Sequence, residues 1–139
     1  MKLSVKSDYA ARAVLGLARH YPSGHAVRVD ALAEGQGVPA NYLVQILIDL
    51  KSKHIVKSHR GKEGGYLLAR PPSEITLADV LQAIHGQIFD SPALSDPRCP
   101  VELRSAWRRL QQSVEEAAGG ITFQELLESS QNKEKMYYI

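Results

Sequence analysis

The sequence feature that most restricts the fold is a glycine-rich stretch, HRGKEGGYLLARPP, at residues 59–72. Two short apolar runs accompany its glycines: HIVKS at residues 54–58 and GYLLA at residues 65–69. Each run has the length and residue types of a β-strand, and two such runs joined by a short glycine-containing loop predict a β-hairpin. Pro71-Pro72 would end the second strand, because proline cannot donate to a sheet ladder.

The tip of this predicted hairpin is both basic and conformationally permissive. It carries Arg60 and Lys62, and we expect Gly64 and Gly65 to take positive φ there without strain. Such a loop suits a phosphate group. The glycines are not followed by the G-K-[ST] of a P-loop, and GKEGGY neither begins with G-x-G nor leads into a helix. A nucleic-acid backbone is therefore the predicted source of the phosphate.

Two predicted helices joined by a glycine-containing turn precede the hairpin. Asp30 would cap the first, which stops by Gly35 or Gly37, and the second follows Val38-Pro39. This is the layout of a helix-turn-helix, whose second helix enters the major groove of DNA. On that helix we expect Tyr42, Leu43, Ile46, Leu47 and Leu50 to face inward, and Asn41, Val44 and Gln45 to face outward. Asparagine and glutamine pair with adenine edges, and valine can touch a thymine methyl. A plain helical hairpin with polar surface residues has the same pattern.

Two further helices are expected in the N-terminal half. SDYAARAVLGLARHY, at residues 7–21, has apolar residues at helical spacing, with Ser7 or Asp8 as the cap. The other helix follows Thr76, which stands three residues before Asp79 in the manner of a capping box.

The distribution of charge indicates a polyanionic partner. Residues 1–84 carry 11 Lys and Arg against 7 Asp and Glu, whereas residues 85–139 carry 6 against 8. Within residues 51–70 six basic side chains stand against Glu63 alone. A local basic patch on a nearly neutral chain is the footprint expected for a nucleic acid, and a solvated charged face is the plainer alternative.

The C-terminal half predicts a helix that pairs with another. Residues 87–100 are rich in turn-forming residues and form a predicted loop. In the next helix, apolar residues alternate at spacings of four and three, the a/d seam of a coiled coil: Leu103, Trp107, Leu110, Val114 and Ala117. Gly119-Gly120 would end this helix, and Thr122 with Glu125 would begin another. The polar tail from residue 131 is expected to be disordered.

Composition and residue order exclude several classes of protein. The apolar runs are too short to span a membrane, and Arg12 and Arg19 interrupt the first of them, which argues against a signal peptide. The single cysteine, Cys99, excludes an internal disulfide, so we expect a cytoplasmic protein. The histidines lack metal-ligand spacing and no catalytic arrangement stands out, so we predict that the chain is not an enzyme.

The sequence resembles the Rrf-two family of bacterial transcription regulators over roughly residues 1–128. The resemblance rests on MKLSVKSDYAARAVLGLA, on VPANYLVQILIDLKSKHIVKSHRGKEGGYLLARPPSEITLADVLQAIHG and on LRSAWRRLQQSVEEAAGGITFQELL. Its most specific part is the R-G-x-x-G-G-Y-x-L-A-R-P run from Arg60 to Pro71. It implies a mainly α fold with a small β-hairpin wing: a winged helix-turn-helix followed by a long C-terminal dimerisation helix.

The resemblance also implies a division of the chain and a set of partners. Residues 1–86 would form the DNA-binding domain, 87–100 a sensor-type loop, 101–130 the dimerisation helices and 131–139 a tail. The expected partners are double-stranded DNA, a second copy of the chain and a protein effector. The predicted DNA-binding residues are Lys6, Tyr9, Ala40, Asn41, Tyr42, Val44, Gln45, Lys51, His59, Arg60, Gly61 and Lys62. The predicted dimerisation residues are Leu103, Trp107, Leu110 and Val114.

Members of this family commonly hold an iron–sulfur cluster, so the resemblance makes such a cluster a candidate cofactor of this chain. Three cysteines of the loop before the long helix would be ligands, but this chain has only Cys99, with Ala93 and Ser105 at the usual spacing on either side. Asp8 falls where some members supply a carboxylate ligand from a partner subunit. Asp8 and Cys99 are therefore the metal-ligand candidates, and the alternative is a helix cap and an ordinary loop residue. We predict no cofactor, and expect any redox response to involve the Cys99 thiol beside Arg98.

The sequence thus predicts a transcription regulator that binds a pseudo-palindromic operator as a homodimer, as a repressor or by recruiting polymerase, in response to redox or iron status. One alternative is a clusterless regulator controlled by a protein partner. Another is a small metabolite-binding helical protein.

Overall fold

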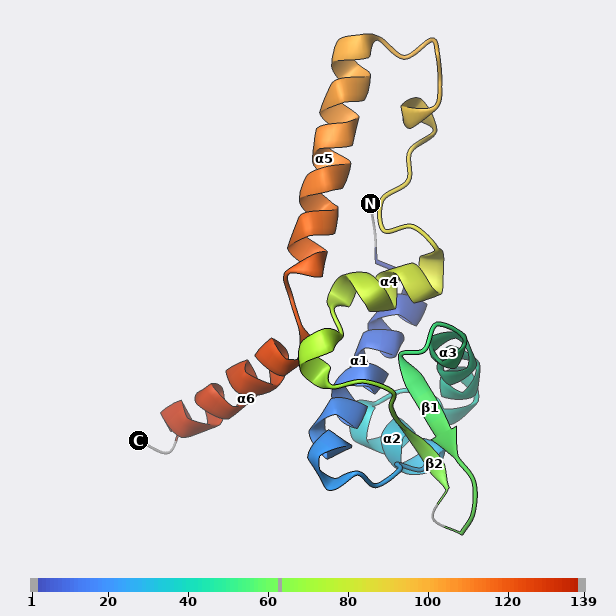
Figure 1. Cartoon of the computed structure of the whole chain (residues 1–139), viewed down its shortest axis with the longest axis vertical. Coiled ribbons are helices and arrows are strands. Elements are labelled where there is room, and N and C mark those ends of the chain that lie inside the picture. The colour runs from blue at the N-terminus through green and yellow to red at the C-terminus, as the bar shows by residue number, and fades with distance from the viewer. Residues whose placement is uncertain (1–2, 63, 138–139) are drawn as a thin grey trace.

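The computed structural model describes residues 3–62 and 64–137, with side chains described up to residue 130. Its helices are α1 (Val5–His20), α2 (Val29–Gln36), α3 (Ala40–Ser52), α4 (Leu77–His85), α5 (Val101–Gly119) and α6 (Phe123–Tyr137). The two strands are β1 (Val56–His59) and β2 (Gly65–Leu68), and short 3-10 turns lie at Tyr21–Ser23, Pro72–Glu74 and Pro92–Leu94. Figure 1 shows α1 to α4 and the hairpin gathered in one body, from which α5 projects. Within the described residues every helix is too short or too polar to cross a bilayer.

The core is built around α1, which contacts α2, α3, α4, α6 and β2. Most of the side chains that the spacing predicts as inward are buried on α1 and α3, and they include Leu17, Leu43 and Leu47. Tyr42 is an exception, because 45% of its surface is exposed. Its ring packs edge-on against Tyr9, with centroids 5.7 Å apart, so it borders the core instead of entering it.

The starts of α1 and α2 differ from those expected. The N-cap of α1 is Ser4, whose hydroxyl accepts a hydrogen bond from the Ser7 amide at 3.0 Å. Ser7 and Asp8 therefore lie inside the first turn, where the helix dipole favours a carboxylate. The N-cap of α2 is Arg28, without a side-chain cap bond, so the prediction of Asp30 is also wrong. The Arg28 side chain donates to Asp30 at 3.3 Å, and this bond lowers the pKa of the Asp30 carboxyl.

The predicted hairpin is present, and a third segment extends it. β1 and β2 pair antiparallel with Val56 opposite Leu68 and His59 opposite Gly65. Val27, in the link before α2, exchanges two backbone hydrogen bonds of 2.8 Å with Tyr66. The link before the helix-turn-helix is thereby joined to the edge of the wing.

The glycines of the hairpin tip act differently from the prediction. Gly61 adopts a positive φ of +125°, whereas neither Gly64 nor Gly65 has a positive φ. A Cβ on Gly65 would lie 2.2 Å from the Val27 carbonyl oxygen, so glycine at this position permits the close approach of two backbones.

The segment between α5 and α6 pairs with the segment before α4. The capping box of α4 forms as predicted. Thr76 Oγ1 accepts a hydrogen bond from the Asp79 amide at 3.1 Å, and Asp79 Oδ2 accepts one from the Thr76 amide at 3.0 Å. The Phe123 amide, at the start of α6, donates to the Ile75 carbonyl at 3.0 Å, and the Phe123 side chain is fully buried.

The start of α6 therefore belongs to the core around α1, and it lies within the segment that the family resemblance assigns to the dimerisation helices. α6 also continues through Tyr137, where a disordered tail is expected, and residues 138–139 lie outside the described part.

Candidate nucleic-acid interface

The N-terminus of α3 and the tip of the wing line one groove. Ala40, Asn41 and Val44 come from α3, while Gly61 and Lys62 come from the hairpin tip, and the groove encloses about 640 Å³. These five residues belong to the predicted DNA-binding set. The fold therefore brings a helix end that can reach base edges beside a basic loop that can reach the backbone.

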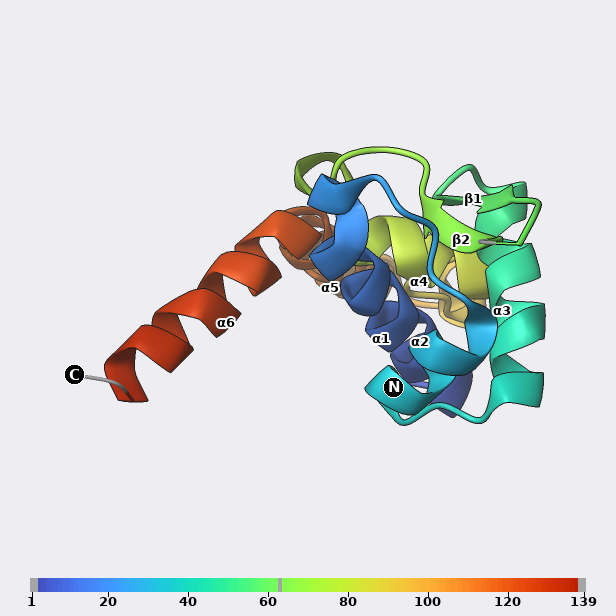
Figure 2. The ribbon, with the colours of Figure 1, turned by 90° about the horizontal axis from the view of Figure 1, so that it is seen from below.

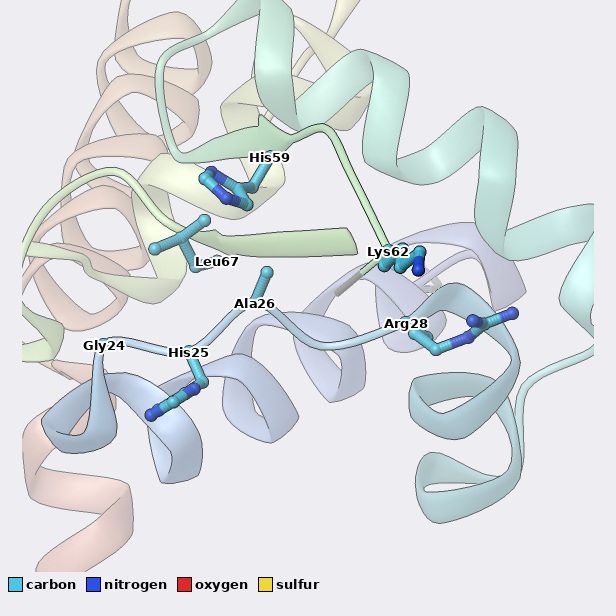
Figure 3. Close-up of a pocket in the computed structure, with 7 residues that line it drawn as sticks. All are labelled: Gly24, His25, Ala26, Arg28, His59, Lys62 and Leu67. Atoms are coloured by element: carbon cyan, nitrogen blue, oxygen red, sulfur yellow. The ribbon is translucent and has the colours of Figure 1, made fainter. Parts of the chain in front are cut away.

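A second pocket lies on the outer side of the wing, with a volume of about 450 Å³. Figure 3 shows its lining: His25 and Arg28 from the link before α2, His59 and Lys62 from the hairpin, with Ala26 and Leu67 between them. None of the described residues that line this pocket is acidic. Arg28 and Lys62 also line the groove, where Arg28 pairs with the carboxylate of Asp30 at 3.3 Å.

His25 and Arg28 are absent from the sequence prediction. Their position depends on the pairing of Val27 with Tyr66 across 38 intervening residues. The short alternation AVRV at residues 26–29 is the only local sign of a strand here.

The other outward residues of α3 connect to α1 and β1. Figure 2 shows α3 and the hairpin on one side of the molecule, with α6 extending on the other. Lys51 Nζ donates to Ser58 Oγ at 2.7 Å and thus ties the end of α3 to β1. Gln45 Nε2 donates to Asp49 Oδ1 at 3.3 Å, and Lys6 Nζ lies 2.7 Å from Asp49 Oδ2. Asp49 is another residue that the sequence prediction misses.

The remaining predicted contact residues are also at the surface. Arg60 is exposed at the wing tip. Tyr9 is half-buried between the Tyr42 ring and the Arg12 guanidinium, whose carbon lies 5.7 Å from the Tyr9 ring centroid.

The seam of α5 is largely uncovered in the single chain. Leu103 and Leu110 expose 46% and 45% of their surface, and Val101, outside the seam, exposes 74%. Trp107 and Val114 are half-buried. An apolar stripe on a projecting helix is the surface that the coiled-coil spacing predicts.

The residues around Cys99 do not fit an iron–sulfur cluster. Such clusters need about four ligands, mostly thiolates, and no group of three or more His, Cys, Asp and Glu placed to hold a metal occurs among the described side chains. Arg104 Nη2 instead donates to the carbonyls of Asp96 at 2.7 Å and Cys99 at 3.0 Å, so an arginine organises this loop. Asp8 pairs with Arg12 Nη2 at 2.9 Å, and its proposed role as the helix cap is wrong.

Several known proteins are similar to this chain in sequence and architecture. A family model described as "Rrf2: Iron-dependent Transcriptional regulator" matches residues 3–129. Rv1287 of Mycobacterium tuberculosis H37Rv, named among the HTH-type transcriptional regulators, is 42% identical over 119 residues, covering 82% of this chain and 73% of the relative. The structure of T. potens IscR superimposes with a TM-score of 0.77 at 31% identity, over 94% of this chain and 88% of that one. CymR, the global cysteine regulator of B. subtilis, superimposes with a TM-score of 0.80 at 28% identity, over 91% and 95% of the two chains.

These similarities extend over both the helix-turn-helix with its wing and the C-terminal helices. They agree with the family resemblance and with the winged-helix fold expected from the sequence. The chain belongs to the Rrf2 (Rrf-two) family of helix-turn-helix transcription regulators, and it is a DNA-binding regulator and not an enzyme.

Proposed function

We propose that this regulator binds a pseudo-palindromic operator as a homodimer, with α3 in the major groove and the wing over the adjacent backbone and minor groove. The observation that carries the proposal is the shared groove, in which Asn41 and Val44 of α3 face the same space as Lys62 of the wing. A helix end can read base edges from there, while the wing contacts phosphates.

The dimer is supported by the exposed seam of α5. Two copies of a stripe containing Leu103 and Leu110 can bury each other across a two-fold axis, because such an interface uses the same surface twice. A two-fold dimer presents two recognition helices, and an operator with matching half-sites follows from that symmetry.

Wing variants test the proposal. Lys62→Ala should weaken binding to operator and random duplexes about equally, and reduce the salt slope by about one per lost phosphate contact. Arg60→Ala should lower operator affinity and reduce the preference for A·T-rich flanks, because an arginine senses the narrow minor groove of such sequences. Fluorescence anisotropy over a potassium chloride series, on an operator selected from a random library, measures both.

The matched control is Arg108→Ala, which removes one positive charge from exposed α5. It should leave the salt slope unchanged. A Lys62→Ala protein with the wild-type slope would place the wing away from DNA and contradict the proposed docking.

The dimer makes a separate prediction. Leu110→Asp should raise the dimer dissociation constant by roughly two orders of magnitude. The dimer contains two copies of Leu110, and each would lose the burial of a half-exposed leucine, worth about 1–3 kcal/mol. Ser105→Asp adds the same charge at an exposed α5 position outside the a/d seam and should leave the dimer intact. Sedimentation velocity at micromolar concentration distinguishes them. If the wild-type protein sediments as a monomer at this concentration, the model of a dimer on paired half-sites is wrong.

We also propose that DNA binding does not require a cluster held by this chain, because Cys99 is its single thiol. Control by a protein partner suits such a regulator. Protein purified without oxygen should show no visible absorption from iron–sulfur charge transfer and should still bind the operator. An absorbing, iron-containing sample whose loss of iron abolishes binding would contradict this.

A further inference from the structure

One carboxylate holds two side chains that are predicted to contact DNA. Asp49 Oδ2 lies 2.7 Å from Lys6 Nζ, and Asp49 Oδ1 accepts from Gln45 Nε2 at 3.3 Å. The Lys6 and Asp49 side chains are 35% and 28% exposed, so the pair is partly shielded from solvent. Asp49 therefore connects the first turn of α1 to the outward face of α3.

The spacing along α3 places Asp49 at the edge of the reading surface. Gln45 and Asp49 are four residues apart, and side chains at that spacing are neighbours on one face of a helix. Val44 and Ile48, on the same outward side, expose 44% and 49% of their surface. The Asp49 carboxylate faces the same direction as residues that would approach DNA. Its negative charge would repel the phosphates and lower the affinity for DNA, so we expect it to serve another purpose.

The first effect of Asp49 concerns the orientation of the Gln45 amide. An ionised carboxylate only accepts hydrogen bonds, so the Gln45 NH₂ group must face it and the flipped amide would set two oxygens together. With one N–H given to Asp49, Gln45 retains one N–H and its carbonyl oxygen. One donor and one acceptor are what bidentate pairing with adenine uses.

The second effect concerns the charge of Lys6. Its ammonium lies against Asp49, so the positive charge at the start of α1 is neutralised locally. Each lysine that neutralises a phosphate steepens the salt dependence of binding and strengthens binding to any sequence. The ion pair with Asp49 therefore keeps Lys6 from making one sequence-independent phosphate contact in each subunit.

We propose that Asp49 is a specificity-determining residue that orients Gln45 for base reading and withholds Lys6 from the DNA backbone. The inference rests on the proposed function, in which the outward face of α3 enters the major groove. Asp49 acts through Gln45 and Lys6 and is a positioning residue. Its effect is lower affinity for random DNA and a sharper preference at one base pair.

Two substitutions separate the two effects. Asp49→Asn removes the charge but keeps an oxygen that accepts from Gln45, whereas Asp49→Ala removes both. Asp49→Asn should bind random duplexes several-fold more tightly at low salt, with a slope steeper by about 0.9 for each released lysine. Its amide can present either its oxygen or its NH₂ group to Gln45, so it should retain only part of the wild-type base preference. Asp49→Ala should show the same slope and lose about fivefold or more in discrimination at the Gln45 base pair.

The experiment measures anisotropy of wild type, the two Asp49 variants and the Lys6→Ala/Asp49→Asn double variant. Each is titrated with the operator, with single-base variants of it and with a scrambled duplex, over a potassium chloride series. The double variant should return to the wild-type slope, because the released lysine is gone. A wild-type slope in Asp49→Asn, or unchanged base preference in Asp49→Ala, would overturn the inference. If wild type itself does not distinguish operator from scrambled DNA, the proposed function fails instead.

Discussion

Replacing Phe123 with alanine should lower the free energy of unfolding by about 3–5 kcal/mol, the usual cost of truncating a fully buried aromatic side chain. Phe123 is the largest of the fully buried side chains, and it packs in the same cluster as residues of α1 and α4. Its amide also donates to Ile75. The substitution should therefore loosen α6 from the DNA-binding body as well as destabilise the fold.

Urea denaturation followed by circular dichroism measures this loss. Phe123→Leu retains most of the apolar volume and should recover most of the stability, because swaps that nearly conserve volume are tolerated best. Ser129→Ala, at an exposed position on α6, should change little. A loss below about 1 kcal/mol for Phe123→Ala would mean that α6 does not complete this core.

Replacing Gly65 with alanine should cost about 2–5 kcal/mol, a sum of overpacking and two lost backbone hydrogen bonds. The new Cβ would lie 2.2 Å from the Val27 carbonyl oxygen and 2.9 Å from the Arg28 amide nitrogen, and both are backbone atoms that cannot rotate away. The pairing of Val27 with Tyr66 should open. Arg28 would then lose its place beside Lys62, so DNA affinity should fall as well.

Amide hydrogen exchange at Val27 and Tyr66, together with thermal unfolding, reports the opening. Gly35→Ala is the matched control, because a Cβ there meets no atom within 4 Å. In α2 it should be neutral or stabilise by about 0.5–1 kcal/mol. Protection at Val27 that survives Gly65→Ala would show that the wing tolerates a side chain at this contact.

Local pattern accounts for much of the agreement between sequence and structure. The inward residues of α3 are buried because periodicity along a helix decides which face is apolar. The capping box of Thr76 and Asp79 forms because both partners lie within one turn. The hairpin and the uncovered seam of α5 follow from patterns of similarly short range.

The errors share a different physical origin. Asp30 and Asp8 are good cap residues, but α2 starts at Val29 and α1 at Val5, one residue and three residues before them. Helix limits depend on competing caps and on tertiary contacts, so residue preference alone settles them poorly. Tyr42 fits the apolar spacing yet stays at the surface, because Tyr9 offers its ring a partner there.

Local residue patterns were enough to predict the fold class, the helix-turn-helix with its basic wing and the apolar stripe of α5, because each depends on residues near one another in the chain. The pairing of Val27 with Tyr66, the packing of Phe123 beside Ile75 and the ion pair of Asp49 with Lys6 became apparent in the folded chain alone. These contacts join residues far apart in sequence. Their partners are chosen by which surfaces the packed core brings within hydrogen-bonding distance, and no local pattern of residues records that choice.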